Sequence, residues 1–416
     1  MGAQASSGAV ADDGQGQHPY RWAVLAGVWL VYFCFGLTSA ALPPLVSVIR
    51  ADLSLSASAM GSILGAWQLV YIGAAIPLGL ALDRMGLRRA LLAAVLIIAL
   101  SGGLRATAED HFTLFLAVAL FGIGGPLISI GAPKLVAVWF GPRQRGLAMG
   151  LYMTGPALGG IVSLTMTNSI AMPLAGGNWR WVFLAYAGFV LLASAAWLLI
   201  SAHPAVRASE LGAKNAKREP QGDVFRALLQ VRAVRLLLLM SIGLFFFSHG
   251  LNNWLPEILR AGGMSAKSSG VWAAIPVAIG IVAAILIPRL AIPQRRYRVM
   301  LCLLVCGLGA SLLLQAQALP ITALGLVLQG IGQGTSMIIA MLILVEQPEV
   351  GAQRAGTAGG LFFAFAEIGG VLGPLSLGVI FDATNSFSPA LAVLTAIMVL
   401  LVFLLLRLRK MAPARA

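Results

Sequence analysis

The chain has 416 residues, of which 59% are hydrophobic and 10% are charged, and its mean hydropathy is +0.91. Soluble domains carry about 25% charged residues, so this composition excludes an ordinary water-soluble domain and indicates a polytopic membrane protein. The formal net charge of +14 raises the question of nucleic-acid binding, which the positions of the basic residues answer below. The three cysteines lie inside apolar runs and suggest neither a disulfide framework nor a metal knuckle.

The first 19 residues, MGAQASSGAVADDGQGQHP, are polar and glycine-rich, and no basic segment precedes an apolar core. A signal peptide needs both features, so we expect a disordered tail. Apolar runs of about 20 residues, long enough to cross roughly 30 Å of hydrocarbon, follow along the chain. Twelve runs are predicted: 22–49, 58–82, 90–107, 112–139, 146–172, 180–202, 234–259, 269–288, 299–317, 320–345, 356–381 and 388–406.

Each run is expected to be a helix, because backbone polar groups in lipid must be satisfied within the segment and barrel strands would alternate in polarity. The predicted fold is therefore an all-α bundle of twelve transmembrane helices in the lipid bilayer. With the N-terminus inside, one set of alternate loops holds 22 of the 28 Lys and Arg residues. The positive-inside rule then places both termini in the cytoplasm of a cell (inner) membrane protein, so the charge reports topology rather than nucleic-acid binding.

A short loop, GLALDRMGLRR, connects the second and third runs. Glycines allow a tight turn, and an aspartate can accept charge-assisted hydrogen bonds or face a helix N-terminus. The arginines could instead serve only as topology determinants, and this alternative stays open. The residues singled out in this loop are Gly79, Asp83, Arg84, Gly86, Arg88 and Arg89.

The fourth run contains a lysine, Lys134, about seven residues from its expected cytoplasmic end, or roughly 10 Å deep. A cation in a partly desolvated site would suit an anionic substrate. Its long side chain could equally reach the cytoplasmic surface, and the sequence does not decide between the two.

The longest polar segment, from His203 to Arg232, has six runs before it and six after it. Shifting the chain by 210 positions aligns residues 141–160 with 351–370 at seven identities in 20, so helices 5 and 11 are predicted to be equivalent in two repeated halves. The predicted organisation is a tail (1–19), a six-helix bundle (20–202), a cytoplasmic linker (203–232), a second six-helix bundle (233–407) and a cytoplasmic tail (408–416).

Polar side chains interrupt several runs at spacings that place them on one helix face. The densest set, on helix 7, just precedes Pro256: its asparagines could bind a small polar substrate or satisfy backbone groups that the proline frees. A histidine there could bind substrate or carry a proton, although it could also be merely hydrogen-bonded. The candidate substrate-binding residues are Tyr32, Gln68, Tyr71, Tyr152, His249, Asn252, Asn253, Trp254, Gln329 and Gln333, together with Lys134.

Glu367 lies about twelve residues into the eleventh run, in the segment LFFAFAEIGGVLGP, and therefore near mid-membrane. Ionisable groups at this depth are costly and usually face a cavity or a partner. Glu367 could exchange a proton as a cavity changes sides, form a helix-packing hydrogen bond in its neutral form, pair with a cation such as Lys134, or contact the substrate directly. The matching position in the first half is Ala157, so the acid is an asymmetry between the halves.

The loop GLALDRMGLRR after the second run resembles the signature loop of the major facilitator superfamily, and the resemblance extends over nearly the whole chain. It implies that helices 1, 4, 7 and 10 line a central cavity and that the loop latches the halves on the cytoplasmic side. GLYMTGPALGG resembles the GPxxGG element of the superfamily's drug/proton antiporters, but helix 4 lacks their mid-depth arginine. Strings such as FFFSHGLNNWLPEILRAGGMS look like the cyanate and nitroimidazole transporter-like branch, or a related organic-anion branch.

The expected function is secondary active transport of a small organic anion or small polar solute by alternating access, coupled to protons through Glu367. The alternatives are a proton-coupled drug efflux antiporter and, from another class, a channel. An enzyme is not expected, because HExxH, GxSxG and metal-spaced Cys/His patterns are missing from the sequence. We expect no cofactor and no metal, a small molecule and protons as partners, and a monomer.

Overall fold

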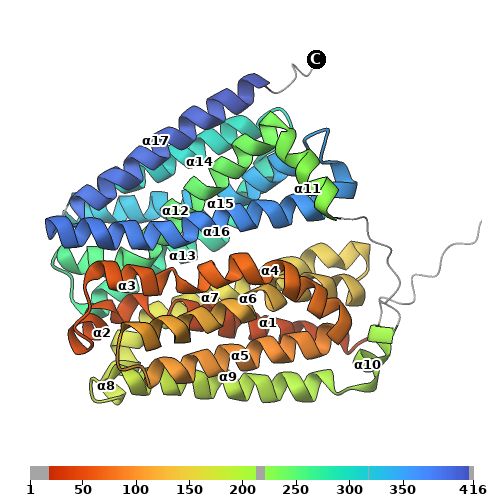
Figure 1. Cartoon of the computed structure of the whole chain (residues 1–416), viewed down its shortest axis with the longest axis horizontal. Coiled ribbons are helices and arrows are strands. Elements are labelled where there is room, and N and C mark those ends of the chain that lie inside the picture. The colour runs from red at the N-terminus through yellow and green to blue at the C-terminus, as the bar shows by residue number, and fades with distance from the viewer. Residues whose placement is uncertain (1–17, 212–220, 317, 412–416) are drawn as a thin grey trace, which may run out of the picture.

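The computed structural model describes residues 18–211, 221–316 and 318–411, and these residues are almost entirely helical (Figure 1). Most of the predicted N-terminal tail and the end of the C-terminal tail lie outside them. The first half contains α1 (Arg21–Ser39), η2 (Pro43–Leu45), α2 (Val46–Asp52), α3 (Ala57–Leu64), α4 (Ala66–Met85), α5 (Leu87–Ala106), α6 (His111–Trp139), α7 (Pro142–Met166), η3 (Thr167–Ala171), α8 (Met172–Leu174) and α9 (Trp179–Ser201).

Two helices, α10 (Pro204–Leu211) and α11 (Gln221–Gln230), lie in the segment predicted to be the linker. The second half contains α12 (Arg232–Ala261), α13 (Ala266–Leu286), η4 (Ile287–Leu290), α14 (Arg296–Leu313), α15 (Leu319–Val345), α16 (Gly351–Thr384) and α17 (Ser388–Met411).

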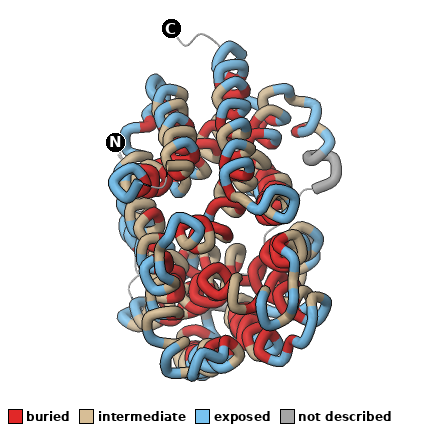
Figure 2. Tube along the Cα trace, turned by 90° about the vertical axis from the view of Figure 1, so that its left-hand side faces the viewer, coloured by how far each residue is buried: buried red, intermediate tan, exposed pale blue. Residues whose placement is uncertain are grey.

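The predicted all-α membrane fold is confirmed. Within the described residues, eleven helical segments are long and apolar enough to cross a membrane. The predicted second span, 58–82, corresponds to α3 and α4, which meet at Gly65. Large apolar side chains such as Leu192 and Leu199 are exposed on the periphery, whereas Figure 2 shows buried residues inside each bundle. Soluble proteins bury most of their large apolar side chains, whereas this apolar periphery fits contact with lipid.

Glycines bring the helices of each bundle into backbone contact. A Cβ atom on Gly159 of α7 would collide with the carbonyl oxygen of Phe33 in α1, and one on Gly369 of α16 would collide with the carbonyl oxygen of Ile242 in α12. Close backbone contact at a glycine therefore joins α1 to α7 and α12 to α16. Since α7 and α16 are the predicted helices 5 and 11, this agrees with their predicted equivalence. Small residues permit such close approach where lipid supplies no hydrophobic force between helices.

The two bundles meet along a seam beside α16, and α3 faces α16 at the left of Figure 1. We call the end with α2, α3 and the C-terminus of α16 the closed end, and the end with the α4–α5 turn the basic end. At the closed end, a Cβ on Gly61 would stand 2.5 Å from Pro374 O, and one on Gly65 would stand 3.0 Å from Val371 O. Toward the basic end, a Cβ atom would meet no neighbouring atom if it were added to Gly146, Gly150, Gly356 or Gly360. The bundles are therefore in close backbone contact at the closed end, whereas these four glycines of α7 and α16 make no such contact.

A polar contact reinforces the closed end. The carboxylate of Asp382, near the end of α16, accepts hydrogen bonds from the backbone N–H groups of Ala57 (2.8 Å) and Ser58 (2.7 Å) at the start of α3. A carboxylate is unfavourable at its own helix C-terminus but favourable at another helix N-terminus. Asp382 therefore connects the second bundle to the first.

Candidate functional site

A cluster of polar side chains occupies the middle of the seam, around Gly370 of α16. The position of a Cβ on Gly370 would lie 2.7 Å from Glu367 Oε2, 3.0 Å from Gln68 Cγ and 3.4 Å from His249 Cδ2. Gln68 comes from α4 of the first bundle, and His249 comes from α12 of the second, where Gln68 Nε2 lies 3.2 Å from His249 Nδ1. We call Gln68, His249 and Glu367 the seam cluster, because these residues join the two bundles in the middle of the seam.

Glu367 is buried at 5% exposure, and its Oε2 atom has no hydrogen-bond partner among the described residues. Within that part of the chain it also forms no ion pair, so the structure does not support a fixed pair with Lys134. Aromatic rings enclose the neighbouring His249, with centroids 5.0 Å away for Phe245 and 5.9 Å away for Trp67. A carboxyl group in this setting has little water around it to stabilise a charge.

The predicted amides of α12 and α15 form a second group next to the seam cluster. Gln329 Nε2 donates to Asn252 Oδ1 at 2.9 Å and lies 3.5 Å from Gln333 Oε1, which joins the two helices. Asn253 instead donates to the carbonyl oxygen of His249, one turn earlier on its own helix (2.8 Å). Asn252 therefore connects to α15, while Asn253 satisfies its own backbone.

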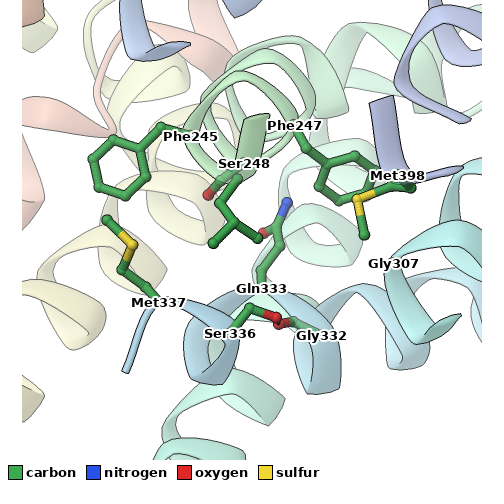
Figure 3. A pocket seen from close by; sticks show the side chains of 10 residues that line it. Phe245, Phe247, Ser248, Gly307, Gly332, Gln333, Ser336, Met337 and Met398 are labelled. Atoms are coloured by element: carbon green, nitrogen blue, oxygen red, sulfur yellow. The ribbon is translucent and has the colours of Figure 1, made fainter. Parts of the chain in front are cut away.

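A small cavity of about 30 Å³, enough for one water molecule, lies beside these amides. Figure 3 shows Gln333 reaching toward it, with Ser248 of α12 and Ser336 of α15 close by. Gln329 Oε1 and Gln333 Nε2 are buried without a partner among the described residues. The amide group thus keeps both donor and acceptor capacity for a further polar molecule.

The predicted tyrosines lie in the first bundle, on the other side of the seam. The rings of Tyr32 (α1) and Tyr152 (α7) meet edge to face at 5.2 Å, and both are buried. The hydroxyl of Tyr71 (α4) is hydrogen-bonded to the hydroxyl of Ser129 (α6) at 2.9 Å. The predicted tyrosines therefore lie in the first bundle, opposite the amides of Asn252, Gln329 and Gln333 in the second.

Two predicted substrate contacts lie apart from this centre. Lys134 is half-buried near the C-terminal end of α6, nine residues and thus roughly 13 Å along the helix from Gly125, which packs against Tyr71. Trp254 is fully buried, and its indole nitrogen donates to Pro374 O at 2.9 Å within the second bundle. Lys134 therefore lies toward the basic end, away from the seam cluster, and Trp254 takes part in helix packing.

We expect Trp254→Phe to lower the melting temperature and leave the KM for substrate unchanged. The substitution removes the hydrogen bond to Pro374 O, worth about 1 kcal/mol, and leaves a small void. Thermal unfolding in detergent and uptake kinetics in proteoliposomes measure the two effects. A raised KM at an unchanged melting temperature would instead show that Trp254 contacts substrate.

The loop predicted to latch the halves forms a tight turn between α4 and α5. Gly86 adopts φ +85°, a conformation that favours glycine. Arg88 donates to Ser201 O at the end of α9 (3.3 Å), within the same bundle. Arg84 and Arg89 are exposed, and Gly79 makes an ordinary contact with Ile130. The side chain of Asp83 lies outside the described residues, so its predicted latch stays a prediction.

Two polar residues that the sequence did not single out connect helices near the closed end. Besides Asp382, Arg105 is fully buried, and its guanidinium donates to Thr38 O (2.9 Å) at the C-terminus of α1, between the rings of Phe121 and Phe183. Arg105 therefore stabilises the end of α1 electrostatically. A signal existed for Asp382, since an acid in the last turn of a helix opposes the helix dipole, but nothing in the sequence identified its partner.

Two helical bundles that meet at a buried polar seam define a membrane transport protein. A sequence profile described as Major Facilitator Superfamily matches residues 28–374, and the chain belongs to this family. It is similar to three bacterial transporters. These are the Uncharacterized transporter YycB of Bacillus subtilis (strain 168), 26% identical over 92% of this chain and 94% of that one; the Hexuronate transporter of the same organism, 26% identical over 82% and 83%; and the Probable galactarate/D-glucarate transporter GudP of Escherichia coli (strain K12), 24% identical over 88% and 89%.

The fold is also that of a solved transporter. The nucleoside transporter NupG superimposes with a TM-score of 0.76 at 13% identity, covering 94% of this chain and all of that one. This likeness concerns the fold alone. Together the findings confirm the predicted superfamily and make the protein a multi-pass membrane transporter.

Proposed function

We propose that the protein carries a small organic anion together with a proton, by opening the two ends of its seam in turn. The observation that carries the proposal is Glu367, a carboxyl group buried at mid-helix on the seam without an ion-pair partner among the described residues. The names of two relatives, for hexuronate and for galactarate or D-glucarate, support the substrate class.

The charge on Glu367 explains why an anion and a proton would travel together. Two like charges a few ångströms apart repel strongly where water is excluded, so an anion in the seam favours the neutral form of Glu367. By reciprocity, protonation of Glu367 raises the affinity for the anion by the same factor. With Glu367 protonated, the seam that holds a monovalent anion carries one negative charge instead of two, and this lowers the cost of closing the seam around the substrate.

The remaining predicted residues supply recognition in this proposal. Asn252, Gln329 and Gln333 offer amides from the second bundle, while Tyr32 and Tyr152 lie across the seam in the first. Amides and hydroxyls can pair with both the hydroxyl and the carboxylate groups of a sugar acid. Lys134, near the basic end, attracts anions toward the seam. The basic end faces the cytoplasm under this proposal, following the positive-inside rule.

Proteoliposomes loaded at alkaline pH and diluted into acidic buffer test the function. We expect radiolabelled D-glucuronate, D-galacturonate or galactarate to accumulate above equilibrium, and a proton ionophore to abolish the accumulation. Preloading with unlabelled substrate should accelerate labelled uptake, because a carrier exchanges and a channel does not. Failure of all three acids to exchange would overturn the substrate class.

Drug efflux is the second candidate, since GPALGG on α7 resembles the element of drug/proton antiporters. The structure offers a packing role for that element: Cβ atoms on Gly155 and Gly159 would meet the α1 backbone at Trp29 and Phe33. The same liposomes separate the two functions, because an antiporter would expel norfloxacin under a pH gradient and would not accumulate sugar acids.

A further inference from the structure

We propose that Gln68 is a positioning residue: its Oε1 atom accepts a hydrogen bond from the O–H group of neutral Glu367. The protonation of Glu367 in the second bundle is thereby tied to the contact of that bundle with the first. The inference rests on the proposed function, because it needs Glu367 to exchange a proton. It adds the residue that would transmit this exchange across the seam.

Three observations place Gln68 for this role. It is fully buried on α4, and its Nε2 atom lies 3.2 Å from His249 Nδ1. Its Oε1 atom and Glu367 Oε2 are both buried and both lack a hydrogen-bond partner among the described residues. The two side chains are neighbours, because Gln68 Cγ and Glu367 Oε2 each lie within 3.0 Å of the Cβ position of Gly370.

The chemistry of an amide explains why these two unpaired oxygens matter. The nitrogen of Gln68 only donates, so His249 Nδ1 is the acceptor and Gln68 Oε1 remains available to accept. An ionised Glu367 also only accepts, and two acceptors facing each other in a dry seam repel. A neutral Glu367 has one O–H donor, which satisfies Gln68 Oε1. Protonation therefore turns a repulsive contact between α4 and α16 into an attractive one.

Other groups around Glu367 leave this assignment intact. Among the described side chains, the titratable groups that face Glu367 are His249 on α12 and Tyr71 on α4, whose hydroxyl is bonded to Ser129. The helices α3 and α15, which also pack against α16, contain no titratable residue. Arg226 lies in the middle of α11, a helix at the basic end in Figure 1. The basic residues Arg407, Arg409 and Lys410 lie in the last turns of α17.

Infrared difference spectroscopy of the purified full-length protein in liposomes tests the proposal without substrate. The carboxylic acid band that disappears in Glu367→Gln belongs to Glu367, and its pH titration gives a midpoint. In Gln68→Leu we expect this midpoint to move to lower pH by about one unit, the equivalent of one net hydrogen bond to the neutral acid. In Gln68→Glu we expect it to move to higher pH, because two carboxyls sharing one proton hold it more tightly.

The matched control is Gln329→Leu, which removes an equally buried glutamine that contacts Asn252 instead. Its midpoint should equal that of the unchanged protein, and gel filtration should show all variants to be folded. If Gln68 had only a structural role, Gln68→Leu and Gln68→Glu would not move the midpoint of Glu367 in opposite directions. An unchanged midpoint in both variants overturns this inference alone, whereas the lack of any band that Glu367→Gln removes overturns the proposed proton site as well.

Discussion

Replacing Glu367 with glutamine is expected to abolish accumulation driven by a pH gradient while leaving substrate exchange in place. The amide resembles the neutral acid in shape and hydrogen bonding but cannot release a proton, so the carrier can return only when loaded. We expect at least a tenfold loss of concentrative sugar-acid uptake in proteoliposomes, with a counterflow rate within a few fold of the unchanged protein.

The matched control is Glu349→Gln, which neutralises an exposed acid between α15 and α16. It should retain both activities, because its carboxylate is in water and away from the seam. If Glu367→Gln still accumulated substrate against its gradient, another group would have to carry the proton.

Replacing Asp382 with alanine is expected to open the closed end more often. The side chain caps the N-terminus of α3 with two hydrogen bonds that must break when the bundles separate there. Since Asp382 is exposed, screening by water reduces their worth to about 1 kcal/mol, which shifts the population of the open form roughly fivefold. Spin labels at Glu109 and Ser268, in a background without the three cysteines, report the distance between the bundles at this end.

Asp110→Ala is the matched control for this experiment. Asp110 also caps a helix with its carboxylate, but the helix is α6 of its own bundle, where it accepts from Thr113 N–H at 2.8 Å. Its loss should cost stability and leave the distance between the labels unchanged. Equal distance distributions in Asp382→Ala and the unchanged protein would mean that the contact does not hold the closed end.

Hydropathy alone predicted most of the membrane helices, because the length of an apolar run is set by the bilayer. It missed the break between α3 and α4 at Gly65, since the apolar run continues through that glycine. The break coincides with a tertiary contact, because Gly65 lies against the backbone of α16 in the other bundle.

The members of the seam cluster were predictable one by one, but not as a cluster. Gln68, His249 and Glu367 were each conspicuous as polar residues in apolar helices. Their meeting point depends on how far each helix is rotated and shifted, which hydropathy does not specify. For Lys134 the sequence suggested a contact that the described residues do not form. Its charge made it a possible partner for Glu367, but its position on α6 keeps it toward the basic end.

The number of protons that cross the membrane with each substrate molecule tests the central claim most directly. Liposomes containing a pH-sensitive dye, clamped at zero membrane potential, are given an inward gradient of the sugar acid that exchanges fastest. We predict about one proton taken up with each substrate molecule in the unchanged protein and no coupled proton in Glu367→Gln, while labelled substrate still exchanges. The same ratio of protons to substrate in both proteins would contradict the role of Glu367.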